Sequence, residues 1–576
     1  MAGARSAEAS RASARVAARS SGACGGDASA PTVCVVVWGM AGQTVLGPVD
    51  VPEETTVGDL RRRVVGSVAL AEDLTEASRA CGRFRGGCVG MGALGQPAVH
   101  LLFGHTELSD ATALRDLRHK DLSASSDTLE ISMVLTRVSC RAITWGDGKF
   151  GGGSATASGQ LVAGVVAVHC TERAFAVLKD SGQVVAWGDS RYGGHAGEAS
   201  KLLIAGNVTA LCGNERAFAA GTEDGRIITW GDASCGGDVS VINRGRDRLK
   251  APADPVVALH STDRAFAART ASGCVIAWGH PEFGGDILGC ESDLACGVRE
   301  IFANGCAFAA LKESGAVIAW GDAQGGGDAA NARPKLTRGV ESIHGTKRAF
   351  AAILERGAVV AWGDPTHGGA MPDCVFADVA SGILTICGNS RAFAAVKAGG
   401  GIVTWGDAHS GGDSSAVREQ LQEGVLGVYS DVESVAFAAT KATGALVVWG
   451  QPAAGGDVGA ASECLSSGVT AVVSNGLAFA AVKAEGGLVT WGFPSSGGDS
   501  SAAVPALAAA GAPLVGVCGT AMAFAALTRS GGVVTWGTRR FGGVLPEGRQ
   551  AELAEGVVVL RSNGGAFVAL KPARIA

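Results

Sequence analysis

Ten times between residues 145 and 543, the chain contains Trp-Gly, four further residues and then Gly-Gly. Neighbouring tryptophans of this motif are 42 to 48 residues apart, and only Trp38 of the 11 tryptophans lies outside it. A period of this size is the signature of a repeat architecture, in which each unit buries its apolar surface against its neighbours. The ten tryptophans are Trp145, Trp187, Trp230, Trp278, Trp320, Trp362, Trp405, Trp449, Trp491 and Trp536.

Each repeat carries two further fixed positions. Twelve residues before nine of the tryptophans stands a Phe with Ala on both sides, and seven residues after that Phe stands a Gly. The runs around both aromatics are short and apolar, which favours strands, and a third apolar run of the type Gly-Val-x-x-Val precedes them. The nine Phe are Phe175, Phe218, Phe266, Phe308, Phe350, Phe393, Phe437, Phe479 and Phe524.

The Gly between the Phe and Trp strands predicts a β-hairpin, because glycine supplies the positive φ that a tight turn needs. A two-residue turn at 181–182 places Phe175 opposite Gly188. It likewise places Ala176 opposite Trp187. We therefore predict that each large ring lies beside a small partner.

The two ends of the array are incomplete in complementary ways. The first Trp strand, at Trp145, has no Ala-Phe-Ala strand before it, and the last Phe strand, at Phe567, has no Trp strand after it. An open solenoid more naturally ends in polar caps, whereas a propeller can build one sheet from both ends. We predict a mainly β fold, a β-propeller of ten sequence repeats closed by pairing of its two ends. One wide ring and a divided array, such as seven plus three, both stay open.

The repeat resembles those of the regulator of chromosome condensation superfamily. The shared words are Val-x-x-Val, a strand ending in Ala-Leu-Lys, then Ser-Gly and Val-Val-Ala-Trp-Gly-Asp, and they recur over residues 140–576. The compact unit is most similar to the short repeats of the secreted β-lactamase inhibitor propellers of that superfamily. The resemblance implies a propeller, commonly of seven blades. Gly-Gly-Asp here replaces the family's usual Gly-Gln-Leu-Gly.

The region before the repeats divides into two segments. Residues 1–32 are rich in Ala, Ser, Arg and Gly and poor in large apolar residues, which predicts a disordered tail. Residues 33–135 suggest strand, turn, strand, helix, strand, strand, and the words VHLLFGHTELSDATALRDL and DTLEISMVL resemble ubiquitin. We predict a small α+β ubiquitin-like (β-grasp) domain with a Gly-rich insertion near residues 71–96, followed by the propeller at residues 136–576.

The ubiquitin resemblance implies a recognition patch. Ubiquitin's apolar patch falls on Met40, Leu102 and Ser132 of this chain, and the first two of these are apolar. Met40 and Leu102 are therefore candidate partner-binding residues, and the implied partners are receptors of the ubiquitin system.

The composition limits the kinds of partner and the cellular compartments that we expect. The formal net charge is -6 and the pI about 6.0, so we expect no nucleic-acid partner. No apolar stretch is long enough to cross a membrane. The 16 Cys form no Cys-x-x-Cys pair and no recurring position, which argues against zinc and disulfides and predicts the cytoplasm or nucleus. The Arg-rich, acid-poor N-terminus leaves an organelle transit peptide as the alternative.

Two sets of charged residues recur in the repeats. Asp residues such as Asp232 and Asp238 bracket the Gly-Gly loops. Calcium ligation and capping of their own turns are the two interpretations; we favour capping, and so expect no metal site. Arg stands two residues before the Phe in five repeats, which predicts a partner-binding arc unless each Arg pairs with a local acid. These candidates are Arg173, Arg216, Arg264, Arg348 and Arg391.

No catalytic constellation emerges, because the 10 His occupy no repeated site and no P-loop or dinucleotide fingerprint is present. We predict no enzymatic activity, no catalytic residues and no cofactor. The expected function is a non-enzymatic protein-interaction scaffold that acts as an adaptor in the ubiquitin system. One alternative is a guanine-nucleotide exchange or chromatin-binding protein of the chromosome-condensation regulator type. The other is a substrate-recognition subunit associated with a ubiquitin ligase.

Overall fold

The computed structural model describes residues 139–238 and 254–573 in full, together with the backbone of short strands between residues 11 and 136. The chain forms two compact units, residues 1–77 with 91–138, and residues 78–90 with 139–576. The second unit contains all ten Trp-Gly motifs.

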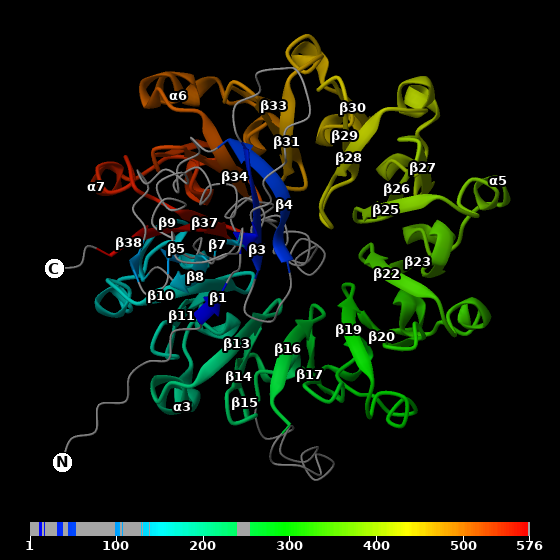
Figure 1. Cartoon of the computed structure of the whole chain (residues 1–576), viewed down its shortest axis with the longest axis horizontal. Helices are drawn as coiled ribbons and strands as arrows, with labels where there is room; N and C mark the ends of the chain where they lie inside the picture. The colour runs from blue at the N-terminus through cyan, green and yellow to red at the C-terminus, as the bar shows by residue number, and fades with distance from the viewer. Residues whose placement is uncertain are drawn as a thin grey trace. The chain divides into compact units, whose positions relative to one another are not determined.

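The repeats fold into three-stranded antiparallel sheets, each built from a Gly-Val strand, a Phe strand and a Trp strand. Eight of these repeat sheets are separate, and a six-stranded sheet contains two more, joined at the single pair Val165–Cys140. Figure 1 shows the sheets following one another in chain order, and the recurring three-stranded sheets confirm a propeller-like repeat fold.

The strands of the first five repeat sheets in chain order are β10 (Val165–Cys170), β11 (Ala174–Lys179), β12 (Val184–Gly188); β13 (Val208–Gly213), β14 (Ala217–Thr222), β15 (Ile227–Gly231); β16 (Val256–Ser261), β17 (Ala265–Thr270), β18 (Val275–Gly279); β19 (Val298–Ala303), β20 (Ala307–Lys312), β21 (Val317–Gly321); and β22 (Val340–Gly345), β23 (Ala349–Leu354), β24 (Val359–Gly363). The other five sheets are β25 (Ile383–Gly388), β26 (Ala392–Lys397), β27 (Ile402–Gly406); β28 (Val425–Tyr429), β29 (Ala436–Lys441), β30 (Leu446–Gly450); β31 (Val469–Ser474), β32 (Ala478–Lys483), β33 (Leu488–Gly492); β34 (Leu514–Thr520), β35 (Ala523–Thr528), β36 (Val533–Gly537); and β37 (Val559–Ser562), β38 (Ala566–Pro572), β9 (Cys140–Gly146).

The hairpin register differs by one residue from the predicted register. Phe175 pairs with Trp187 and does not face Gly188. The prediction was wrong because the turn contains three residues, 180–182, the last of them a glycine with a φ of 74°. A tight turn followed by a left-handed glycine is a common three-residue hairpin loop.

Because of this register, the two large rings of each repeat stack on each other. Their centroids lie 5.1–5.5 Å apart in all ten repeat sheets. The indole N–H of nine tryptophans donates to a Gly carbonyl of the preceding repeat at 2.9–3.2 Å. Each of these tryptophans therefore links two neighbouring sheets.

The first and last strands of the array share a sheet. β9 pairs antiparallel with β38, and Phe567 lies opposite Trp145 with ring centroids 5.2 Å apart. The Trp145 indole N–H donates to the Gly542 carbonyl (3.2 Å), and the Asn563 amide donates to the Phe150 carbonyl (2.7 Å). The predicted pairing of the two ends is present, and Figure 1 shows β9 beside β38.

The first strands share one position that we did not anticipate. His169, His260 and His344 each pair with the Ala that follows the Phe. Three Cys occupy the same position in other sheets, so the prediction that neither type recurs was wrong. It failed because His and Cys alternate there with other residue types. The three Cys are Cys212, Cys387 and Cys518.

Desolvation lowers the pKa of His169 and of His344 to about 4, and the charge of Arg561 adds to the shift at His169. In the unfolded chain, each of these His side chains binds a proton below about pH 6.5, whereas in the folded chain the same side chains stay neutral. Stability is therefore intact above this pH and falls as the pH drops towards 4. We expect the melting temperature to fall between about pH 7 and pH 5, and to fall less in a His169→Gln/His344→Gln variant. An equal fall in both proteins would contradict this.

Short helices connect the strands, and the Gly-Gly pairs turn the chain as predicted. After the first Trp strand, Gly151 follows a one-turn helix with a φ of 86°. A Cβ at Gly152 would lie 2.5 Å from the Gly146 carbonyl, so the second glycine is required by close backbone approach. Among the described residues, no helix has the length and apolarity needed to cross a membrane.

The helices that follow the Trp strands are η1 (Gly148–Phe150), η3 (Ser190–Tyr192), η5 (Ala233–Cys235), η7 (Pro281–Phe283), η8 (Ala323–Gly327), η11 (Pro365–His367), η12 (Ala408–Ser410), η14 (Pro452–Ala454), η16 (Pro494–Ser496) and η18 (Arg539–Phe541). The other described helices are η2 (Ser158–Gln160), η4 (Gly197–Ala199), α3 (Ser200–Ile204), η9 (Arg333–Lys335), η10 (Glu355–Gly357), α5 (Asp373–Phe376), η13 (Ser415–Leu421), η15 (Gly459–Ala461), η17 (Ser501–Ala503), α6 (Val504–Ala510) and α7 (Glu547–Gln550).

The N-terminal unit is described only by its strands. β3 (Thr32–Trp38) and β4 (Thr44–Pro52) form an antiparallel hairpin, and β8 (Ile131–Thr136) pairs with β5 (Ala98–Phe103) and β1 (Arg11–Ser13). β6 (Thr106–Glu107) pairs with β5, and β2 (Val16–Ala17) with β7 (Thr128–Leu129).

These strands do not establish the ubiquitin-like fold, which stays a prediction. The predicted helix after residue 52, the insertion near 71–96, Met40 and most of the predicted tail at 1–32 lie outside the described residues. Leu102 belongs to β5, but its side chain is outside the description.

Candidate protein-interaction face

The turns between the first and second strands lie side by side. In six successive steps from Glu172 to Ser434, the N–H of one turn donates to the carbonyl of the next turn at 2.9–3.3 Å. We call the surface formed by these turns and the loops after the Trp strands the turn face. Its turns are 171–173, 214–216, 262–264, 304–306, 346–348, 389–391, 430–435, 475–477, 520–522 and 563–565, and its loops begin at 147, 189, 232, 280, 322, 364, 407, 451, 493 and 538.

A buried Asn or Thr holds most of these turns against their loops, and our reading of the sequence missed it. Nine of the ten repeats have this residue four positions before the Phe, and its side chain donates to a loop carbonyl at 2.6–3.0 Å. Its oxygen also accepts turn N–H groups, as Asn214 does from Ala217 at 2.7 Å. The fixed spacing to the Phe was a usable signal, although two residue types share the position.

The loop aspartates cap their own turns, as we favoured. Five of them accept the N–H two residues later at 2.9–3.0 Å. At Asp189, the side-chain hydrogen bond from Arg191 also lowers the pKa of the carboxyl group. In the described ranges, no group of three or more His, Cys, Asp or Glu could hold a metal ion. The five are Asp147, Asp189, Asp232, Asp322 and Asp364.

Four of the five candidate arginines are paired with local acids. The Arg348 guanidinium lies 2.8 Å from Asp322 and 3.3 Å from Asp364, which belong to neighbouring loops. The others have a Glu carboxylate oxygen at 3.5–3.8 Å. Such partly exposed pairs contribute little stability each. Glu172 and Glu215 directly precede Arg173 and Arg216 in the chain, whereas the pairs Arg264–Glu215 and Arg348–Asp322 connect neighbouring repeats. These other arginines are Arg173, Arg216 and Arg264.

Aromatic rings contact three of these arginines, among them Arg264, whose guanidinium carbon lies 5.2 Å from the centre of the Phe283 ring. The Arg173 guanidinium carbon lies 5.1 Å from the centre of the Phe150 ring and 4.9 Å from that of Tyr192. The Arg216 guanidinium carbon lies 5.1 Å from the centre of the same Tyr192 ring. These cation–π contacts add to the ion pairs, so this part of the predicted arc braces the sheets.

Arg391 is the exception among the five. Its side chain is exposed and makes no ion pair or hydrogen bond with any residue that the structure describes. The loop carboxylates equivalent to those that bind Arg348 have other partners: Asp364 contacts Arg348 and Thr366, and Asp407 accepts from Ser410 at 2.6 Å. Of the predicted binding arc, Arg391 is therefore the cation available to a partner.

One repeat sheet has an apolar pair where others have an ion pair. Leu477 occupies the Arg position of sheet β31–β33, and Phe493 occupies the loop Asp position. The Phe493 N–H donates to the Leu477 carbonyl at 2.9 Å, as Asp364 does to Arg348 at 2.9 Å, so the backbone is unchanged. The two side chains are 43% and 47% exposed. We did not single out this pair because neither residue belongs to the repeat consensus.

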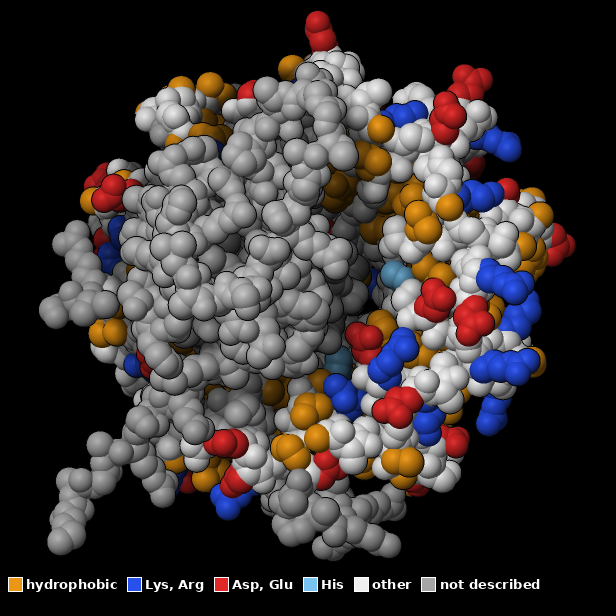
Figure 2. All heavy atoms as spheres, viewed as in Figure 1, with side chains coloured by type: hydrophobic (Ala, Val, Ile, Leu, Met, Phe, Trp, Pro, Cys, Tyr) orange, Lys and Arg blue, Asp and Glu red, His pale blue; other side chains and the backbone are white. Residues whose placement is uncertain are grey.

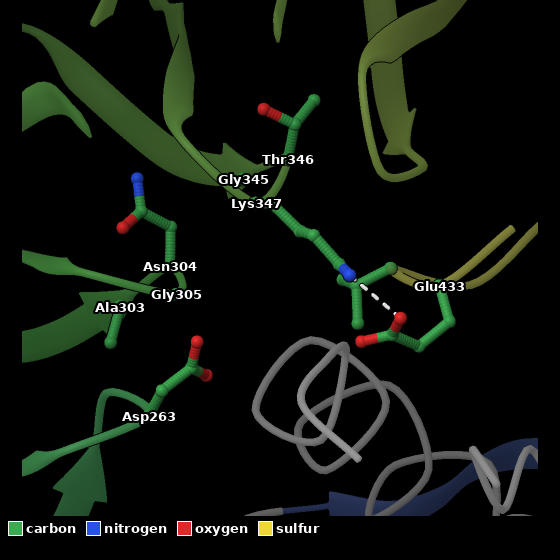
Figure 3. A pocket seen from close by; sticks show the side chains of 9 residues that line it. Asp263, Ala303, Asn304, Gly305, Gly345, Thr346, Lys347 and Glu433 are labelled. Atoms are coloured by element: carbon green, nitrogen blue, oxygen red, sulfur yellow. Dashed lines mark hydrogen bonds and ion pairs between the residues drawn. The ribbon is translucent and has the colours of Figure 1, made fainter. Parts of the chain in front are cut away.

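The turn of sheet β28–β30 is longer than its equivalents. Residues 430–435 separate β28 from β29, whereas 389–391 separate β25 from β26. The longer turn carries Glu433, whose carboxylate lies 2.6 Å from the Lys347 ammonium group, two repeats away. Figure 3 shows this pair on one side of a small pocket, with Asp263 on the other. The cavity of about 30 Å³ can hold water but no organic ligand.

Asp431 replaces the Asn or Thr in this longer turn. Its carboxylate accepts the N–H groups of Glu433 (2.8 Å) and Ser434 (2.9 Å). Burial raises the pKa of this carboxyl group despite those bonds. A carboxylate has no hydrogen to donate to a loop carbonyl, so this turn is held differently from the nine others.

Acidic and basic side chains are intermixed around the ring. In Figure 2, Lys and Arg lie among Asp and Glu over the sheets from β19 to β27. No broad surface of one sign is visible in this view, so specificity on the described surface depends on individual groups.

No family model matches the chain, and no curated protein matches it. Solved structures match the chain at low identity. Prp20 from Saccharomyces cerevisiae is 15% identical, with 75% of this chain and 91% of that chain covered and a TM-score of 0.31. The ectodomain of the receptor kinase CR4 from Physcomitrella patens is 15% identical, with 49% and 73% covered and a TM-score of 0.28. The designed protein Ika8 is 15% identical, with 57% and 96% covered and a TM-score of 0.26. These scores are low, so the fold described here rests on the strand pairing of this chain.

Proposed function

We propose that this protein is a non-enzymatic protein-interaction scaffold whose binding surface includes the turn face. The observation that carries the proposal is a constant backbone with variable side chains. The same turn and loop hold Arg348 with Asp364 in one sheet and Leu477 with Phe493 in another. A surface that presents different groups at fixed positions is suited to recognition of a protein.

The ten repeats, in this proposal, form one closed ring. The pairing of β9 with β38 supports it, as does the bond from Trp145 to Gly542. The Cys170 thiol lies 3.4 Å from the Ser562 carbonyl, which adds a contact between β10 and β37 at the same junction. A closed ring holds every turn in place and so reduces the entropy lost on binding.

Affinity purification of the full chain followed by mass spectrometry tests the scaffold. We expect proteins retained in near-stoichiometric amounts, some of them also retained by residues 136–576 alone. Partners that require residues 1–135 would support the adaptor role in the ubiquitin system inferred from the N-terminal resemblance. If the full chain retains no protein above background, the scaffold proposal fails.

A guanine-nucleotide exchange or chromatin role is the second proposal. It rests on the sequence resemblance to the regulator of chromosome condensation repeats; the structure of Prp20 was described together with its binding to Gsp1p and histones. Accelerated nucleotide release from a small GTPase, or co-sedimentation with nucleosomes, would support it. Co-purification of a ubiquitin-conjugating enzyme would instead favour a ligase-associated subunit.

A further inference from the structure

We propose that Leu477, Phe493 and Arg391 form a docking surface for an acidic segment of a partner protein that carries bulky apolar side chains. This inference deepens the scaffold proposal and rests on it. It names one place on the turn face and the chemistry of the segment that fits there.

Folding does not require the apolar pair. The core of the same repeat sheet is already filled, because Trp491 and Phe479 are buried and stack with centroids 5.3 Å apart. Leu477 and Phe493 lie outside that core at 43% and 47% exposure. An apolar side chain gains free energy when a partner removes it from water, and Arg and aromatic residues are enriched in protein interfaces.

The surroundings of the pair select an acidic partner. Arg391 is exposed and has no ion pair within residues 139–238 and 254–573, and Arg539, in the loop after β36, is also exposed. Arg348, the equivalent of Arg391 in the preceding repeat, binds two carboxylates of the chain itself. A carboxylate supplied by a partner would complete the same arrangement at Arg391.

The longer turn of sheet β28–β30 connects the two parts of this surface. A Cβ at Gly476 would lie 3.1 Å from the Cβ of Glu433, so that turn packs directly beside Leu477. Lys347 neutralises Glu433 at 2.6 Å, so Glu433 presents little charge to repel an acidic segment. An extended segment of about six residues spans roughly 20 Å, enough to cross neighbouring repeats.

The test uses the full chain and a labelled peptide of about twelve residues in which Phe and Leu alternate with Asp and Glu. Matched peptides carry Lys in place of the acids, or Ser in place of Phe and Leu. We expect Leu477→Ser and Arg391→Glu each to weaken binding of the acidic apolar peptide about tenfold. Arg226→Glu, on the hairpin between β14 and β15, makes the same charge change away from the turn face and should leave binding unchanged.

Melting curves establish that each variant folds. The inference is overturned if the peptide does not bind, if the variants bind it as the wild type does, or if the Lys peptide binds equally well. A dimer that dissociates in Leu477→Ser, or oligonucleotide binding sensitive only to Arg391→Glu, would identify another occupant and also overturn it. If Leu477→Ser and Arg391→Glu retain the same cellular partners as the Arg226→Glu control, this inference is wrong, whereas the scaffold proposal still holds.

Discussion

Replacing Trp405 by Ala is expected to lower the free energy of unfolding by about 3–5 kcal/mol. The side chain is 1% exposed and stacks on Phe393 with centroids 5.1 Å apart. Its N–H donates to the Gly368 carbonyl of the preceding repeat at 3.0 Å. The substitution therefore removes core volume and a link between two sheets, and denaturant titration measures the loss.

A matched pair of Trp→Phe variants separates the hydrogen bond from the packing. Trp278 is also 1% exposed, but its buried indole N–H has no hydrogen-bond partner in the part of the chain that the structure describes. Trp405→Phe should therefore cost about 1 kcal/mol more than Trp278→Phe. Equal costs would mean that the bonds between repeats contribute nothing to stability.

Removing residues 556–576 is the second change with a large expected effect, since it deletes β37 and β38. Trp145 and Ile143, which are 1% and 2% exposed, would lose the strand that covers them. We expect a loss of roughly 5 kcal/mol or more, because two buried large side chains become exposed and an edge strand is left unpaired. Amide hydrogen exchange should rise first in β9, more than 400 residues from the deletion.

A chain that ends at residue 573 is the control, because it keeps all of β38. It should melt as the full chain does. If the chain that lacks residues 556–576 also melts as the full chain does, the ends are not joined in solution and the ring proposal is wrong.

The repeat, its three strands and the pairing of the ends followed from spacing, because each depends on residues that recur. The register of the Phe–Trp hairpin did not follow from the spacing. A two-residue and a three-residue turn both fit a Gly after Ser181, and only the backbone shows that Gly182 is the third turn residue. That single residue changes the core from rings beside small partners to rings stacked on each other.

The candidate site was harder to predict for the same reason. The five arginines recur, so the sequence drew attention to them, yet the Asp322 carboxylate that pairs with Arg348 and the Tyr192 ring that contacts Arg173 come near them only on folding. Leu477, Phe493 and Glu433 each depart from the repeat, so a search for recurrence passes over them. In a repeat protein the fold comes from the positions that agree, and recognition from those that differ.

Introducing the ion pair of sheet β22–β24 into sheet β31–β33 tests the central claim most directly. The variant Leu477→Arg/Phe493→Asp gives sheet β31–β33 the pair that Arg348 and Asp364 form, on the same backbone. We expect the free energy of unfolding to change by less than about 1 kcal/mol. Partner proteins that residues 136–576 alone also retain should be lost from an affinity purification of this folded variant. Retention of every such partner in wild-type amounts would contradict the assignment of Leu477 and Phe493 to the recognition surface.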